Sequence, residues 1–281
     1  MLADVPDRTP ARAVSLGLSD PSPLVRREAL LALERQAPQR RRELAGPLLS
    51  DRSRIVRLAA VEALAGVPAR ELDAREKQAF DAAFGELEAS MRFSADRPES
   101  HTYHGTLLAR LGRSEAASQE FQQAIALDRS YAPAYLNWAD TARAAGDEAT
   151  AARVLREGLS RTAGDPALRH ALGLTLVREK RMPEALRELE AAALAAPDNT
   201  RFGYVYAVAL QSAGRLDDAR LALDRALRRA PEDRELLMAA AQYAREMADA
   251  GAQRSYVARA LRAYPDDRAL ASWAEALERT P

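Results

Sequence analysis

The stretch from Pro166 to Asn199, PALRHALGLTLVREKRMPEALRELEAAALAAPDN, decides the fold, because its pattern of small residues recurs with a fixed 34-residue period. One series contains Gly105, Ala139, Gly173, Ala207 and Ala241, and a second contains Ala124, Gly158, Ala192, Ala226 and Ala260. Small residues twelve apart, such as Gly173 and Ala185, let two antiparallel helices approach closely across a short turn. The pattern therefore predicts a stack of helical hairpins.

The 34-residue register divides most of the chain into five repeats. They cover residues 98–131, 132–165, 166–199, 200–233 and 234–267. Pro197, Pro231 and Pro265 are expected to end the second helix of their repeats, because proline lacks a backbone donor. In the tail, residues 268–281, an apolar stripe is predicted to form a helix that caps the last repeat. The stripe contains Leu270, Trp273 and Leu277.

The repeat resembles the tetratricopeptide (TPR) repeat. The residues that carry this resemblance are Leu172-Gly173, Leu176, Ala185, Leu189, Ala192 and Pro197. The resemblance implies two antiparallel helices per repeat and a role in binding proteins or peptides. Some positions depart from the family pattern: Arg129 and Ala163 replace the proline, and His101 and Arg169 replace the tryptophan. Gln253 replaces a small residue, so we expect the last repeat to be shifted or packed more loosely.

A shorter, 31-residue repeat precedes this region. DPSPLVRREALLAL, which starts at Asp20, is echoed by DRSRIVRLAAVEAL, which starts at Asp51. Val25, Ala29 and Leu33 recur at helical spacing and are predicted to form a buried stripe, while the aspartate caps the helix or its preceding turn. These residues resemble HEAT repeats, in which an Asp and a Val-Arg pair open the second helix of a hairpin. The first helices are expected at segments 9–18 and 38–49.

A bridging helix is predicted between the two kinds of repeat. Residues 1–68 form the HEAT-like part, and residues 69–97 contain the bridge. Its helical stripe contains Phe80, Phe84, Leu87 and Met91. The bridge resembles the second helix of an incomplete TPR, so the fold class expected for the chain is all-α, an α-solenoid of helical hairpins.

The composition excludes several classes of function. The 281 residues include 41 acidic and 41 basic side chains, so no global field draws the chain to nucleic acid or to an anionic membrane. With no cysteine, the chain has no disulfide, thiolate zinc site or CxxCH haem attachment. No apolar run approaches the ~20 residues of a membrane span, and the first residues lack the apolar core of a signal peptide. We therefore expect a soluble protein that does not insert into a membrane.

The sequence contains no pattern typical of catalysis, such as a Gly-rich phosphate loop, a nucleophile elbow or an HExxH pair. His101 and His104 are spaced i, i+3, but the third histidine, His170, lies two repeats away and no carboxylate cluster completes a metal site. We expect no catalytic residue, no metal and no cofactor, with His101 and His104 in packing positions. The run Arg40–Arg42 is interpreted as solvated surface, with a phosphate contact as the alternative.

The TPR resemblance implies a binding groove lined by first-helix residues that are not needed for packing. The groove residues expected from it are Thr106, Arg110, Asn137, Asp140, Arg143, His170, Leu174, Arg178, Tyr204, Gln211, Met238, Gln242 and Arg245, with its centre at His170, Leu174 and Arg178. The family often has an asparagine where Asn137 stands, but no asparagine ladder is expected because the equivalent positions lack it.

Four arginines fall at two adjacent positions near the ends of the first helices. They are Arg110, Arg143, Arg178 and Arg245. Guanidinium groups aligned along one edge of the groove favour a partner that bears carboxylates. The alternative is that an arginine-rich chain places arginines on any exposed face. The first hypothesis is thus a non-catalytic scaffold that binds an acidic or mixed acidic and apolar protein segment, and homo-oligomerisation stays open.

A second hypothesis rests on the order of HEAT-like and TPR-like repeats. Together with phrases such as SADRPESHTYHG and FGYVYAVALQSAGRLDDA, this order is similar to the C-terminal region of bacterial multihaem c-type cytochromes. That resemblance implies an interaction module of a larger periplasmic electron-transfer protein whose haem part lies outside this chain; without it, the cytoplasm is expected. A third resemblance, to HEAT-containing bilin lyases, implies an enzyme. The chain has only two HEAT-like units, however, and none of the catalytic patterns described above.

Overall fold

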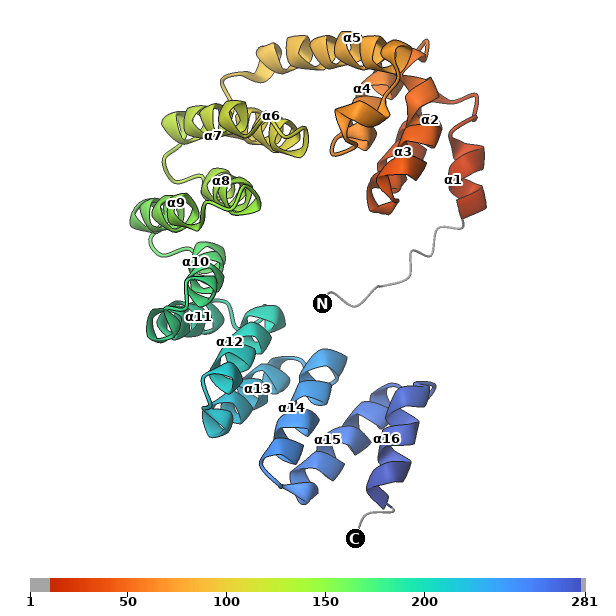
Figure 1. The fold of residues 1–281 in the computed structure, drawn as a ribbon. Helices are drawn as coiled ribbons and strands as arrows, with labels where there is room; N and C mark the ends of the chain where they lie inside the picture. Colours follow the sequence, from red (N-terminus) through yellow and green to blue (C-terminus); the bar gives the residue numbers. More distant parts are fainter. Residues whose placement is uncertain (1–10, 279–281) are drawn as a thin grey trace. The chain divides into compact units, whose positions relative to one another are not determined.

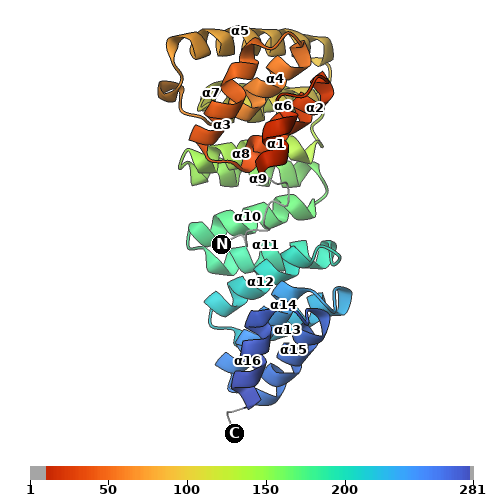
Figure 2. The ribbon, with the colours of Figure 1, turned by 90° about the vertical axis from the view of Figure 1, so that its right-hand side faces the viewer.

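The computed structural model describes residues 11–278, and within this range all regular secondary structure is helical. The predicted all-α solenoid of helical hairpins is confirmed. The chain divides into two compact units, unit 1 (Met1–Thr141) and unit 2 (Ala142–Pro281). Figures 1 and 2 show two views of the ribbon, in which the helices of unit 2 follow one another as antiparallel pairs.

Unit 1 contains α1 (Ala11–Gly17), α2 (Pro23–Leu31), α3 (Pro38–Ala45), α4 (Arg54–Leu64), α5 (Ala74–Met91), α6 (Pro98–Arg110) and α7 (Ser114–Leu127), with short 3₁₀ turns η1 (Ala32–Arg35), η2 (Gly46–Ser50), η3 (Ala69–Glu71) and η4 (Arg92–Ser94). The boundary between the units falls in α8 (Ala132–Ala144). Unit 2 continues with α9 (Glu148–Arg161), α10 (Pro166–Arg178), α11 (Met182–Ala195), α12 (Thr200–Ser212), α13 (Leu216–Arg229), α14 (Arg234–Glu246), α15 (Ala250–Ala263) and α16 (Arg268–Glu278).

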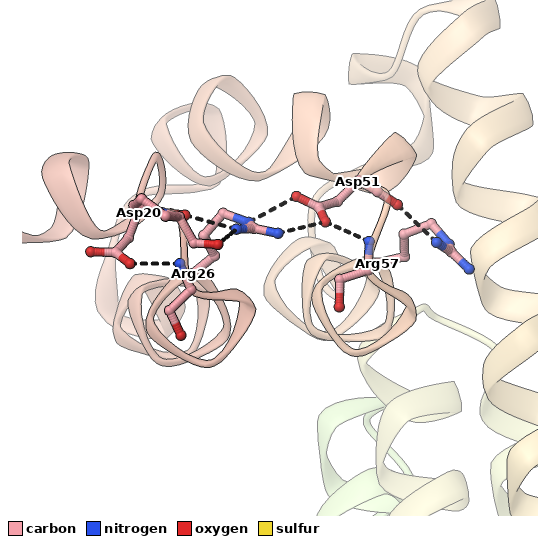
Figure 3. A network of polar contacts seen from close by, with 7 residues as sticks. Asp20, Arg26, Asp51 and Arg57 are labelled. Atoms are coloured by element: carbon pink, nitrogen blue, oxygen red, sulfur yellow. Dashed lines mark hydrogen bonds and ion pairs between the residues drawn. The ribbon is translucent and has the colours of Figure 1, made fainter.

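A buried ion pair joins the two 31-residue repeats of unit 1 (Figure 3). Nε and Nη2 of Arg26 in α2 each donate to one carboxylate oxygen of Asp51, both at 2.9 Å. Nη1 of Arg26 donates to the carbonyl oxygens of Asp20 and Pro21. The pattern repeats at Arg57, which donates to the carbonyl oxygen of Asp51 at 2.8 Å. The aspartates serve the turn before the helix rather than the helix end, since the Asp51 carboxylate accepts the N–H of Ser53 at 2.7 Å.

The predicted burial of Val25 is wrong. Its side chain is 42% exposed, whereas Ala29 and Leu33 are buried as expected. The adjacent Arg26 turns inward in its place, because Asp51 and two carbonyl oxygens satisfy its guanidinium there. The equivalent Val56 is fully buried, since α4 packs against α2, α3 and α5.

The arginine run at the start of α3 is not simply solvated surface, which corrects the interpretation for two of its members. Arg41 is buried, and its Nη1 donates to the carbonyl oxygen of Ala65 at 3.0 Å. Arg42 forms an ion pair with Glu76 of α5 at 3.0 Å. Only Arg40 is exposed. The run therefore fastens α3 to its neighbours.

Helix α5 begins with a capping box. The carboxylate of Asp73 accepts the N–H of Glu76, and the carboxylate of Glu76 accepts the N–H of Asp73. Phe80, Phe84 and Leu87 are buried, in agreement with the predicted stripe. Helix α5 contacts α4 before it and α6 after it.

The hairpins are held together at the small residues that the sequence singled out. A Cβ atom added to Gly173 in α10 would lie 2.6 Å from Cγ of Leu189 in α11. At Gly105 in α6, it would lie 2.7 Å from the ring of Phe121 in α7. Both separations are shorter than ordinary Cβ contacts, so a larger residue at either position would force the neighbouring side chain to move.

Each hairpin turn of this register contains a residue in the left-handed region. The positions are equivalent in the five repeats and hold Gly112, Gly146, Lys180, Gly214 and Ala248, with φ between 58° and 81°. Glycine adopts this conformation without steric cost, whereas lysine and alanine do not. Two of the five turns therefore contain local strain.

The C-terminal end of unit 2 closes the stack. Helices α11, α13 and α15 end two residues before Pro197, Pro231 and Pro265, as the proline positions predicted. Leu270 of α16 is fully buried against the core that runs from α11 to α16, while Trp273 and Leu277 are partly buried.

Candidate functional site

The first helices of the hairpins in unit 2 carry most of the expected groove residues. Helices α10, α12 and α14 begin at equivalent positions of successive repeats, and Asp165 and Asp233 cap two of them by accepting backbone N–H groups. We call the surface of these helices the first-helix face. It contains His170, Leu174, Arg178, Tyr204, Gln211, Met238, Gln242 and Arg245.

The His170 ring connects two of these helices. It stacks on Phe202 of α12 with 4.4 Å between ring centroids and 22° between planes. Burial, with a smaller contribution from Arg201, lowers the pKa of His170 to about 4. The imidazole is therefore neutral at pH 7 and adds no positive charge to the face.

Arg178 is paired within unit 2. Its Nε and Nη2 donate to the two carboxylate oxygens of Glu148 in α9, at 2.6 and 3.1 Å. Nη2 also donates to Oγ1 of Thr175 at 3.1 Å. The charge of Arg178 is thus balanced at the position where the sequence predicted an acidic contact.

Glu246 at the end of α14 links two amide side chains of the face. Nε2 of Gln211 donates to one of its carboxylate oxygens at 3.3 Å, and Nε2 of Gln242 donates to the other at 3.0 Å. Glutamine side chains from α12 and α14 therefore meet on one carboxylate. The neighbouring Arg245 is exposed and forms no ion pair among the residues that the structure describes.

Three residues of the face are apolar. Leu174, Tyr204 and Met238 are each partly buried, and the last two pack against the core of unit 2. Tyr243, beside them on α14, is buried; burial, with smaller contributions from Tyr204 and Glu246, raises its pKa to about 12. The face thus offers partly exposed apolar groups together with polar ones.

The remaining expected residues are divided between the two units. Arg143 is exposed on α8 in unit 2, while Thr106, Arg110, Asn137 and Asp140 lie in unit 1. Nη2 of Arg110 donates to the carbonyl oxygens of Glu62 and Ala65 at 3.2 and 3.3 Å, near the end of α4. A looser ion pair at 3.5 Å joins Arg110 to Glu34.

Two polar side chains of α6 and α8 bond to their own helices. Oγ1 of Thr106 donates to the carbonyl oxygen of Thr102 at 2.8 Å. Nδ2 of Asn137 donates to the carbonyl oxygen of Pro133, also at 2.8 Å. In this conformation the Asn137 amide has one donor already engaged.

His101 and His104 share one carboxylate in unit 1. Nδ1 of His101 lies 2.6 Å from one oxygen of Glu120, and Nδ1 of His104 lies 3.1 Å from the other. Glu88 is farther away, at 3.8 Å from Nε2 of His104. Across residues 11–278, no group of three or more His, Cys, Asp or Glu side chains could hold a metal ion.

Sequence reasoning missed the acidic partners of the face, Glu148 and Glu246. Glu148 is 30 residues from Arg178 and Glu246 is 35 residues from Gln211. Neither separation equals the 34-residue repeat length, so the two glutamates do not occupy the same repeat position as the residues that they contact. Acidic residues that lie roughly one repeat length from a predicted groove residue are the sequence signal for such internal partners.

Comparisons with known proteins agree with this architecture. Tetratricopeptide repeat models match residues 99–131 in unit 1 and residues 176–243 in unit 2. No curated protein matches the chain. None of the helices between residues 11 and 278 is both long and apolar enough to cross a membrane.

Several solved structures are similar. YrrB, a TPR protein with an unusual peptide-binding site, is 19% identical with a TM-score of 0.50, and the match covers 67% of this chain and 97% of YrrB. PilW, a widely conserved type IV pilus biogenesis factor, is 16% identical with a TM-score of 0.53, covering 70% and 91%. PilF of Pseudomonas aeruginosa is 17% identical with a TM-score of 0.50, covering 67% and 92%. At such identities the likeness shows a shared fold.

Proposed function

We propose that the chain is a non-catalytic scaffold that binds a protein or peptide segment on the first-helix face of unit 2. The observation that carries the proposal is the set of partly exposed apolar side chains Leu174, Tyr204 and Met238, which share the face with polar groups. Such side chains can be desolvated by a partner at little cost to the fold, and they are typical anchors of helical peptide-binding surfaces. The peptide-binding site named for YrrB supports this class of function.

The preferred segment is mixed, with apolar residues and some carboxylates. Arg201 and Arg245 are exposed on α12 and α14 and can pair with acidic groups. The centre of the face contributes less positive charge than the arginine count suggests, because Glu148 balances Arg178 and His170 is neutral. Apolar contact therefore supplies the affinity, and the flanking arginines supply the preference for acidic residues.

A selection experiment tests this proposal. Random twelve-residue peptides displayed on phage are selected on the immobilised full chain, and the recovered peptides are synthesised for fluorescence anisotropy. We expect the peptides to combine apolar residues with Asp or Glu. Leu174→Asp should weaken their binding at least tenfold, because it places a charge among the anchors.

Leu221→Asp is the matched control, since Leu221 is an exposed leucine of α13 outside the face. Circular dichroism should show equal helix content for both variants. Equal peptide affinity of the Leu174→Asp variant and the wild type would refute the placement of the site.

The likeness to HEAT repeats, the resemblance to multihaem cytochromes, a periplasmic location and homo-oligomerisation stay predictions. The cytochrome hypothesis has a direct test. A reading frame that extends upstream of Met1 with CxxCH pairs and a signal peptide would support it, and an upstream stop codon in the same frame would oppose it.

A further inference from the structure

A second surface of unit 2 contains a pocket lined in part by small residues. The fourth residue of each 34-residue repeat is His101, Tyr135, Arg169, Gly203 or Leu237. In two hairpins this residue bonds to the residue 19 positions later: His101 to Glu120 at 2.6 Å, and Arg169 to Glu188 at 2.9 Å. In the α12/α13 hairpin the corresponding residues are Gly203 and Ala222. Neither residue has a side chain larger than a methyl group, and a Cβ atom added to Gly203 would lie 3.0 Å from Cβ of Ala226.

This pocket measures about 220 Å³ and opens to solvent between α11, α12 and α13. We call it the Gly203 pocket. Its lining includes Gly203, Tyr206, Ala193, Leu194, Ala222 and Ala226. Leu194 is 61% exposed at its edge. An apolar cavity of about 150 Å³ holds a benzene molecule, so this one has room for an aromatic ring.

The same register position shows that an aromatic side chain suits this place. Tyr135, which precedes Gly203 by two repeats, is fully buried and its hydroxyl donates to the carbonyl oxygen of Arg129 at 2.9 Å. The α12/α13 hairpin lacks that ring. A ring from another molecule can therefore occupy the space that an internal side chain fills elsewhere.

The rim of the pocket is positively charged. Arg225, Arg228 and Arg229 line it, and Glu190 is the acidic residue in the lining. Glu190 interacts with the Tyr206 hydroxyl. Burial raises the pKa of Tyr206, and Glu190 adds a smaller contribution in the same direction. Arg225 forms no ion pair within the described part of the chain, and Arg229 approaches Asp198 only at 4.0 Å. The rim thus complements carboxylates beside the inserted ring.

We propose that the Gly203 pocket binds a peptide segment of a partner protein in which an aromatic side chain is flanked by acidic residues. The aromatic ring enters between Gly203 and Ala222, and the flanking carboxylates pair with Arg225 and Arg229. This site is separate from the first-helix face, because its lining comes from the ends of α11 and α13 and from the side of α12 that faces them. The chain would then hold two segments, or two parts of one partner.

The test uses the full chain and the labelled peptide acetyl-Asp-Glu-Phe-Asp-Glu, with the same peptide carrying Ala in place of Phe as the comparison. Fluorescence anisotropy should show binding of the Phe peptide and at least tenfold weaker binding of the Ala peptide. Ala222→Leu fills the pocket from inside and should also weaken binding at least tenfold. Absence of binding by the Phe peptide at millimolar concentration overturns the proposal.

The rim is tested independently, in case Ala222→Leu disturbs the fold. Arg225→Glu combined with Arg229→Glu changes only exposed side chains and should weaken binding at least tenfold. Arg161→Glu is the matched control, because Arg161 is exposed at the same register position two repeats earlier. Unchanged affinity in the double variant overturns the proposal.

A second copy of the chain is the rival occupant, since Phe93 of unit 1 is 92% exposed. Its sequence neighbours Arg92, Asp96 and Arg97 carry a net positive charge, which makes Phe93 a poor match for a basic rim. Sedimentation of the wild type and of the Phe93→Ala variant separates the two occupants. Self-association that both Phe93→Ala and Ala222→Leu abolish would overturn the proposal in favour of a second copy.

Discussion

Arg26 and Asp51 form a two-pronged ion pair across 25 residues of sequence, with both side chains at most 10% exposed. Burial acts to raise the pKa of Asp51, but hydrogen bonds from Arg26 and from the N–H of Ser53 outweigh it and hold the pKa below its ordinary value. The pair therefore stays ionised inside unit 1. Its geometry leads to the first prediction.

Asp51→Ala should lower the free energy of unfolding by about 3–5 kcal/mol, because it leaves the buried guanidinium of Arg26 without its carboxylate. Urea unfolding of the full chain measures this change. Arg40→Ala is the control, since its pair with Glu43 is half exposed and should contribute about 0–1 kcal/mol. Equal losses in the two variants would contradict the role assigned to burial.

Gly173→Ala should destabilise unit 2 by about 1–3 kcal/mol, because the new Cβ would lie 2.6 Å from Leu189. The same substitution at Gly85 in α5 should stabilise the chain by about 0.5–1 kcal/mol, because nothing lies within 4 Å and alanine favours a helix. Thermal unfolding followed by circular dichroism compares the two. The prediction fails if both variants shift in the same direction.

Ala248→Gly should stabilise the chain by about 1 kcal/mol, because it relieves a φ of 58° at the turn between α14 and α15. Ala258→Gly, in the exposed interior of α15, should cost about 1 kcal/mol. The two variants change composition identically, so urea unfolding isolates the effect of backbone conformation. A loss of stability at both positions would rule out strain at Ala248.

The pKa of His170 gives a prediction about pH. Its folded-state value of about 4 lies below the ordinary value of about 6.5, so the unfolded chain binds the proton more readily. The contribution to stability is complete above about pH 6.5 and is lost as the pH falls toward 4. We expect a loss of about 1–2 kcal/mol after allowance for solvent screening.

His170→Gln should remove that part of the pH dependence. Urea unfolding of both proteins between pH 4 and 9 gives the comparison, and the difference between them should be constant above about pH 7. Parallel curves throughout the range would show that His170 does not titrate as described.

The sequence predicted those parts of the fold that depend on local spacing. Gly173 faces Leu189 because a helix, a short turn and a second helix repeat with one period, and this period is visible in a single chain. Local spacing did not predict that the Arg26 side chain is buried. That choice depends on Asp51 and on carbonyl groups, which only the folded chain brings together.

The candidate site was less predictable for the same reason. The resemblance placed His170, Leu174 and Arg178 on one helix, and all three lie on α10. It did not reveal that Glu148 balances Arg178, or that Arg110 bonds to a carbonyl group of α4, which lies much earlier in the chain. The Gly203 pocket, by contrast, could have been predicted from the sequence. Gly203 and Ala222 are 19 residues apart, and both are smaller than the residues at the equivalent positions of the other repeats.

Arg26 and Arg57 occupy equivalent positions of the two 31-residue repeats, but the carboxylate that pairs with Arg57 lies outside these repeats. One repeat length beyond Asp51 stands Ala82, which has no carboxylate. Glu86, one helical turn further along α5, receives the guanidinium of Arg57 at 2.7 and 3.1 Å instead. Of these two arginines, only Arg57 therefore pairs with α5, whereas Arg26 pairs with the next repeat. The junction between Arg57 and α5 therefore does not depend on how many 31-residue repeats precede it.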